Sequence, residues 1–244
     1  MHILVTNDDG IFAPGLKKLV KEALKYGRVT VIAPKVEQSA KSHSIQVRTP
    51  IEFKKVEDII EGVDTYYADS TPADCVRIAY FYLNLDFDVV FSGVNAGFNM
   101  GEDITYSGTC AAATESAMLG RKGLAFSCNF DDINVVDKEL EKALEFVFKN
   151  NLLDKYALYN INMPKSALGI VFSRQGHTHY YSYYANNDGY LSSLGRPEAS
   201  EDDTILSDVD FTYKKYITIT PLNFLRTNEE VLKKLIDEVK ISNN

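Results

Sequence analysis

The chain has 244 residues, of which 45% are hydrophobic and 25% charged, a composition typical of a globular protein that buries a substantial core. Its 26 basic and 34 acidic residues give a net charge of −8, so we expect no broad basic surface for a nucleic acid duplex. We expect neither a signal peptide nor a membrane span. The three cysteines lack metal-ligand spacing, which favours reduced core residues and a cytoplasmic location.

The first predicted element is a strand that ends on two adjacent carboxylates. Residues 2–6 are rich in β-forming residues, and Gly10 permits a sharp turn after them. Open α/β sheets bind ligands at the carboxyl ends of their strands. Neighbouring carboxylates repel each other unless a cation lies between them. Asp8 and Asp9 are therefore candidate cation ligands, with an Asx-turn or a helix cap as the alternative.

Strand and helix patterns alternate over residues 1–150. The patterns predict helices at residues 14–26, 72–83, 108–119 and 137–148. They predict buried strands at residues 28–33, 88–91 and 123–127, short edge strands at 45–47 and 51–56, and another short strand at 65–68. Such alternation indicates an α/β fold with a doubly wound, mostly parallel sheet.

The pattern changes after about residue 150. We expect strands at residues 158–162, 169–172 and 216–221, and a terminal helix at 228–241. Residues 176–195 between them are rich in tyrosine: Tyr180, Tyr181, Tyr183, Tyr184 and Tyr190. Because exposed aromatic side chains favour subunit contacts, we interpret this stretch as an arm or hairpin that packs on a partner subunit. A tucked surface loop is the alternative.

The predicted organisation is a single domain over residues 1–244. It consists of a core, 1–150, and a smaller C-terminal part, 151–244. That second part contains the tyrosine-rich arm, a closing strand and the terminal helix.

A second polar segment, residues 92–101, follows the strand at 88–91 and reads SGVNAGFNMG. Its glycines let the backbone approach a ligand closely, but their spacing is neither GxGxxG nor that of a Walker loop. Asn95 offers a carbonyl oxygen, a donor that Mg²⁺ or Mn²⁺ accepts. A turn residue in the left-handed region is the alternative for Asn95.

Two further segments carry candidate site residues. Ser107, Gly108 and Thr109 lie at the start of the predicted helix at 108–119, whose N-terminal amides attract anions; simple capping by Ser107 or Thr109 is the alternative and is compatible with anion binding. Ser39 lies in the loop after the second strand, where a solvated serine is the alternative to a metal ligand. The four histidines show no metal-binding spacing, and a GxSxG nucleophile motif is absent.

Together these segments resemble the SurE family of survival-protein nucleotidases. The matching motifs cover most of the chain in the same order: VTNDDG and APGL at the start, Ser39, STPADCV at 70–76, SGVNAGFNMGEDITYSGT at 92–109, NINMP at 160–164 and YITITPL at 216–222. Ala40 stands where the family usually has glycine. Ala111, Ser116 and Cys110 also replace usual family residues in the helix that follows.

The resemblance implies a phosphatase that acts on nucleoside monophosphates and needs one divalent metal ion per subunit, Mg²⁺ or Mn²⁺. It implies a Rossmann-like core and a C-terminal extension exchanged between subunits, hence a homodimer or homotetramer. The implied metal ligands are Asp8, Asp9, Ser39 and Asn95. Asn99 and the Ser107-Gly108-Thr109 turn would face the substrate phosphate.

We expect Asp8 and Asp9 to act in phosphomonoester hydrolysis, with Asp8 nearest the reacting water. Three other functions stay open at this point. A nucleotide sensor would use the same crevice without turnover. A dinucleotide-dependent oxidoreductase would need the missing GxGxxG motif. A dimerisation module would explain the tyrosines but not the polar residues at the strand ends.

Overall fold

The structure is a computed structural model that describes residues 1–129, 133, 136–177, 179–180, 183–194, 197–198 and 207–238. Nine strands of this part form one sheet in the order β3-β4-β2-β1-β5-β6-β7-β13-β8. Their bounds are β1 (His2–Thr6), β2 (Arg28–Pro34), β3 (Phe53–Lys55), β4 (Thr65–Ala68), β5 (Val89–Ala96), β6 (Lys122–Cys128), β7 (Leu158–Met163), β8 (Gly169–Phe172) and β13 (Tyr216–Pro221).

The central strands, from β4 through β2, β1, β5 and β6 to β7, are all parallel. Strand β3 is antiparallel to β4, and β13 is antiparallel to β7 and parallel to β8. The mostly parallel sheet predicted from the alternating pattern is therefore confirmed. Because β7, β13 and β8 lie in the same sheet as β1, residues 151–244 contribute strands directly to the core.

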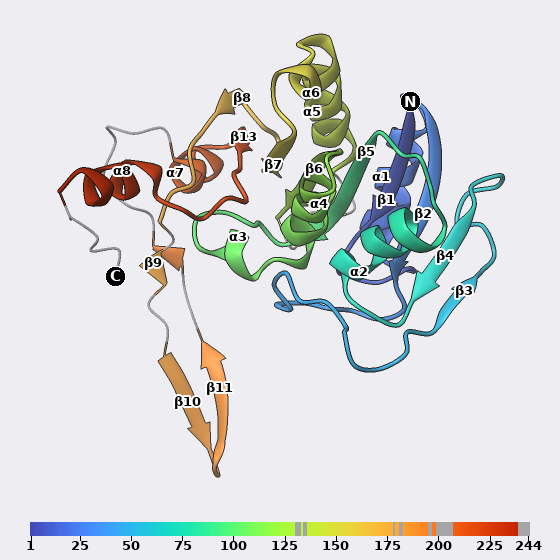
Figure 1. Cartoon of the computed structure of the whole chain (residues 1–244), viewed down its shortest axis with the longest axis horizontal. Helices are drawn as coiled ribbons and strands as arrows, with labels where there is room; N and C mark the ends of the chain where they lie inside the picture. The colour runs from blue at the N-terminus through green and yellow to red at the C-terminus, as the bar shows by residue number, and fades with distance from the viewer. Residues whose placement is uncertain are drawn as a thin grey trace, which may run out of the picture.

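Helices cover both faces of the sheet (Figure 1). The helices of the described residues are α1 (Pro14–Ala23), α2 (Pro72–Arg77), the π-helix η1 (Ile78–Tyr82), α3 (Asp103–Tyr106), α4 (Gly108–Met118), α5 (Asp137–Lys149), α6 (Leu152–Lys155), α7 (Asp208–Tyr213) and α8 (Glu229–Glu238). Helices α1 and α5 pack on one face and α2 and α4 on the other, so the sheet is doubly wound. None of the described helices is long and apolar enough to cross a membrane.

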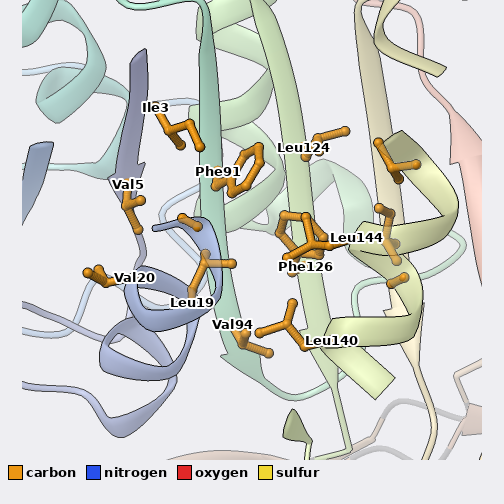
Figure 2. Close-up of a cluster of buried hydrophobic side chains, with 14 of the residues drawn as sticks. Ile3, Val5, Leu19, Val20, Phe91, Val94, Leu124, Phe126, Leu140 and Leu144 are labelled. Carbon is orange, nitrogen blue, oxygen red and sulfur yellow. The ribbon is translucent and has the colours of Figure 1, made fainter. Parts of the chain in front are cut away.

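One hydrophobic cluster of the core lies on the face covered by α2 and α4, and another lies between the sheet and helices α1 and α5 (Figure 2). Phe91 of β5 and Phe126 of β6 are fully buried, with their rings edge to face at a centroid distance of 5.6 Å. Leu19 and Leu140 approach them from the two helices. Strands buried on both faces need nearly continuous apolar runs, which is why their positions were predictable from local sequence.

Two predictions about strands were wrong. Residues 45–47 form no strand, because this backbone bonds to side chains at the start of α2. The Gln46 N–H donates to the Asp74 carboxylate (2.8 Å), and the Thr71 hydroxyl donates to the Ser44 carbonyl (2.7 Å). Strand β5 continues to Ala96 rather than ending at residue 91, with a register shift against β6 between residues 92 and 95.

The tyrosine-rich stretch contains a hairpin of β10 (Tyr183–Asn187) and β11 (Tyr190–Leu194). It extends away from the nine-stranded sheet (Figure 1), and β9 (His179–Tyr180) pairs with β12 (Pro197–Glu198) nearer the sheet. Tyr184 and Tyr190 are 67% and 80% exposed, which fits an arm and not a tucked loop. Tyr181 and the end of the predicted terminal helix, 239–241, lie outside the described residues.

Candidate functional site

The candidate residues meet in a pocket of about 250 Å³ at the carboxyl ends of β1 and β5. It is lined by Asp8, Asp9, Glu37, Ser39, Ala40, Asn95, Ala96, Phe98, Asn99, Asp103, Tyr106 and Ser107. All four proposed metal ligands are in this set. Of the four proposed substrate residues, Asn99 and Ser107 line the pocket, whereas Gly108 and Thr109 lie directly behind it in the first turn of α4.

Asp8 is the most deeply buried carboxylate of the pocket, with 4% of its surface exposed. Burial raises the pKa of Asp8, although the Thr109 hydroxyl and the N–H groups of Thr109 and Gly108 donate hydrogen bonds that oppose this rise. The start of α4 therefore supports Asp8, since helix N-termini favour a negative charge. The Thr109 hydroxyl was expected to face the substrate phosphate, but in the structure it donates to the Asp8 carboxylate.

Gly108 is required by the close approach of α4 to β1. A Cβ atom at this position would lie 2.8 Å from the Asp8 Cβ and 3.1 Å from the Pro72 Cγ. Neither neighbour is the far end of a flexible side chain, so a larger residue would displace Asp8 or the helix. The sequence placed Gly108 at the start of a helix, but only the structure shows that a glycine is needed there because Asp8 lies too close for a Cβ atom.

Asp9 lies at the more open side of the pocket. Its pKa is raised to about 6, first by burial and then by the negative charges of Asp8 and Glu37. The Ala96 N–H donates to it at 3.4 Å, a long hydrogen bond. When both are ionised, Asp8 and Asp9 place two partly desolvated negative charges side by side, which is unfavourable without a cation.

The donor set fits a hard divalent cation. Lys, Arg and His are absent from the residues that line the pocket, so nothing there neutralises the two aspartates. In the described part of the chain, no three His, Cys, Asp or Glu residues gather at metal-binding distances. The candidate set is instead two carboxylates with neutral oxygens, which suits Mg²⁺ or Mn²⁺ better than a softer metal.

Asn95 and Ser39 supply the neutral oxygens. The Asn95 Nδ2 donates to the Gly97 carbonyl at 2.8 Å, so the carbonyl oxygen is the atom that Asn95 can offer to a cation. The exposed Ser39 hydroxyl donates to the Glu37 carboxylate at 2.6 Å. Its loop is tied to the pocket because the Gln38 N–H donates to the Asp8 carbonyl at 2.7 Å.

Ala40, in the same loop, has a left-handed backbone with φ of +56°. This conformation costs a residue with a Cβ about 1 kcal/mol or more, whereas glycine adopts it freely. We expect Ala40→Gly to raise the free energy of unfolding by about 0.5–1 kcal/mol, a rise in Tm of about 1–4 °C for a chain of this size. Thermal unfolding measured by circular dichroism tests this, and a lower Tm would contradict it.

Ser107 has both roles considered for it. Its side chain accepts the Cys110 N–H at 3.1 Å and caps α4, so the capping interpretation is confirmed. The residue also lines the pocket, and a cap does not prevent contact with a ligand.

Asn99 is 7% exposed and is held by residues that the sequence reasoning missed. Its side-chain nitrogen donates to the Ser127 hydroxyl at 2.8 Å, and its backbone bonds to the side chains of Asn160 and Asn162. One signal was available: alternate residues of a strand face the same side, so Asn-x-Asn in a buried strand places two amides together.

Comparison with known proteins identifies related chains. The family model described as "Survival protein SurE" matches residues 3–182. The chain is 36% identical to a protein of Clostridium beijerinckii named 5′-nucleotidase SurE, over 95% of this chain and 96% of that one. It is 34% identical to a 5′-nucleotidase SurE of Thermosipho melanesiensis, over 96% of each chain.

A solved structure shares the fold. The crystal structure of the SurE protein from Aquifex aeolicus superposes with a TM-score of 0.80 at 30% sequence identity. The match covers 96% of this chain and 98% of that one. The similarity therefore includes the C-terminal part as well as the core.

Proposed function

The chain belongs to the SurE family, and on this premise we propose that it is a 5′-nucleotidase, a phosphatase that hydrolyses nucleoside monophosphates to a nucleoside and phosphate. The observation that carries the proposal is the pair Asp8 and Asp9, brought together with two neutral oxygen donors in one pocket. The relatives are named as enzymes, and nothing supports a sensor without turnover.

We propose that Asp8, Asp9, Ser39 and Asn95 hold one divalent cation, Mg²⁺ or Mn²⁺, in each subunit. Such an ion would polarise a phosphoryl oxygen and lower the pKa of a water molecule beside it. The chain itself positions these four ligands, and it places no Lys, Arg or His among the described residues of the pocket lining that would compete with a cation for the carboxylates. Asp8, fixed by the Thr109 hydroxyl, remains our candidate for the residue nearest the reacting water.

Asn99 and Ser107 are the proposed contacts to the substrate phosphate, because both line the pocket beside the aspartates. The positive end of α4 lies behind Asp8 and adds a favourable field for a phosphoryl group. Gly108 and Thr109 act in this scheme mainly through Asp8. Phosphoryl transfer depends on such positioning and charge stabilisation more than on covalent chemistry.

We further propose a homodimer or homotetramer formed through the hairpin and the C-terminal helix, in the cytoplasm. Large exposed apolar side chains support the assembly: Tyr184, Tyr190 and Leu191 on the hairpin, and Leu232, Leu235 and Ile236 on α8. The buried thiols of Cys75, Cys110 and Cys128 fit a reducing compartment.

The central experiment measures phosphate released from AMP by the purified protein with Mn²⁺ or Mg²⁺, before and after EDTA. We expect release with metal, its loss with EDTA and its recovery when metal is restored, because Asp8 and Asp9 need a cation between them. A panel of nucleoside 5′- and 3′-monophosphates then defines the substrate. Binding of AMP without phosphate release under any of these conditions would favour the sensor instead.

A further inference from the structure

Strand β7 buries two asparagines on the same side. Asn160 and Asn162 alternate in its sequence and are both fully buried, in a strand flanked by β6 and β13. A buried amide without hydrogen bonds costs about 2 kcal/mol or more, and a core strand at these positions normally carries apolar residues. These two amides therefore need hydrogen-bond donors and acceptors within the core.

Both asparagines bind the backbone of one residue, Asn99. The Asn162 side chain accepts the Asn99 N–H through Oδ1 at 2.9 Å and donates to the Asn99 carbonyl through Nδ2 at 2.9 Å. Asn160 donates to the same carbonyl at 2.7 Å. Because Asn162 meets a donor with its oxygen and an acceptor with its nitrogen, only one orientation of its amide satisfies both bonds.

The Asn99 side chain is fixed as well. Its Nδ2 donates to the hydroxyl of Ser127, a fully buried residue of β6, at 2.8 Å. Asn99 lies in an irregular segment between Gly97 and Gly101, both with positive φ. Such a segment has no regular secondary structure of its own to fix Asn99, so the buried side chains of β6 and β7 do this.

We propose that Asn160 and Asn162 are positioning residues for phosphate hydrolysis: they hold Asn99 in the orientation in which it meets the substrate phosphate. The inference rests on the proposed function and extends it from the pocket to the sheet beneath. It gives a reason for two polar residues that core packing does not require. Neither asparagine lines the pocket, so each acts through Asn99.

The test is Asn162→Asp, which keeps the shape and the acceptor but replaces the amide donor. The ionised carboxylate would repel the Asn99 carbonyl, and we expect kcat for AMP to fall by about 10–100-fold. The affinity for Mn²⁺, measured by calorimetry, should stay within about twofold, because Asn99 is not among the proposed ligands. Protonation restores a donor, so the ratio of variant to wild-type kcat should rise as the pH falls.

Thr65→Val is the matched control. It removes a buried hydrogen bond of the same sheet, from the Thr65 hydroxyl to the Val63 carbonyl (2.8 Å), in β4, which is separated from β7 by four strands, and we expect wild-type kcat. If Asn162→Asp does not fold, Asn160→Ala deletes the bond to the Asn99 carbonyl, together with the weaker bond that Asn160 accepts from the Cys110 thiol (3.4 Å), and should lower kcat in the same direction. Adding Asn162→Asp to Asn99→Ala should cause little further loss, since the two act through one residue.

A kcat for Asn162→Asp and Asn160→Ala within about twofold of Thr65→Val, with wild-type protein active, would overturn the inference and leave the proposed function intact. A fully additive loss in the double variant would also overturn it. Wild-type protein that releases no phosphate with any metal would overturn both.

Discussion

Asp8→Asn and Asp9→Asn are each expected to reduce phosphate release from AMP by about 10³-fold or more. Each substitution removes one of the two negative charges that we propose hold the cation, and with it several kcal/mol of transition-state stabilisation. We expect the affinity for Mn²⁺, measured by calorimetry, to fall in parallel. Circular dichroism should show an unchanged fold, because asparagine has the shape of aspartate.

The same substitution at Asp9 is expected to stabilise the metal-free protein at neutral pH. The pKa of Asp9 is raised to about 6 in the folded chain, first by burial and then by Asp8. A raised carboxyl pKa means that the stability present below about pH 4 is lost as the pH rises through about 6. Asp9→Asn removes this loss, so its Tm without metal should exceed the wild-type Tm at pH 7 but not at pH 4.

Asp154→Asn is the control for both measurements, because its carboxylate is exposed and pairs with Lys122 at 3.0 Å, outside the pocket. It should leave activity and Mn²⁺ affinity unchanged. Wild-type turnover in both aspartate variants of the pocket would remove Asp8 and Asp9 from the mechanism. A Tm for metal-free Asp9→Asn below that of wild type at pH 7 would show that charge repulsion does not dominate at this site.

Gly108→Ala is expected to lower kcat for AMP by about 100-fold, because the new methyl group would displace Asp8 or the start of α4 by a fraction of an ångström or more. The added Cβ would lie 2.8 Å from the Asp8 Cβ. Overpacking of this kind costs about 1–3 kcal/mol. An unhindered glycine-to-alanine change in a helix would instead stabilise by up to about 1 kcal/mol, so the sign of the change in Tm is diagnostic.

Gly169→Ala in β8 provides the comparison for Gly108→Ala. Its Cβ would meet only the Tyr216 ring, at 3.4 Å, which is ordinary van der Waals contact. We expect this variant to keep wild-type kcat. A Gly108→Ala protein with raised Tm and full activity would contradict the close packing of α4 on Asp8.

Local sequence was sufficient where a single element decides the structure. Three strands, 65–68, 169–172 and 216–221, begin and end where the sequence predicted. The α/β fold was predictable because strands buried between two layers of helices must be apolar along their length. The two aspartates at the end of β1 could be singled out from local sequence as well, because adjacent carboxylates at the end of a buried strand repel each other unless a cation lies between them.

Local sequence failed where distant segments exchange hydrogen bonds. Residues 45–47 look like a strand, but their backbone is bonded to the start of α2. Thr109 looks like an anion donor, but its hydroxyl donates to Asp8, 101 positions away in the chain. Nothing local marks Asn162 as the partner of Asn99, because a hydrogen bond between them exists only once β7 lies beneath the loop.

The sequence by itself determined the kind of fold and the candidate cation ligands, since strand periodicity and donor chemistry are properties of short segments. Only the tertiary structure decided which groups contact each other. Helix α4 packs against Asp8 at Gly108, and β7 holds Asn99 through two side-chain amides. The physical reason is that a hydrogen bond or a close contact depends on the distance and angle between two atoms. For segments far apart in the chain, both are set only by folding.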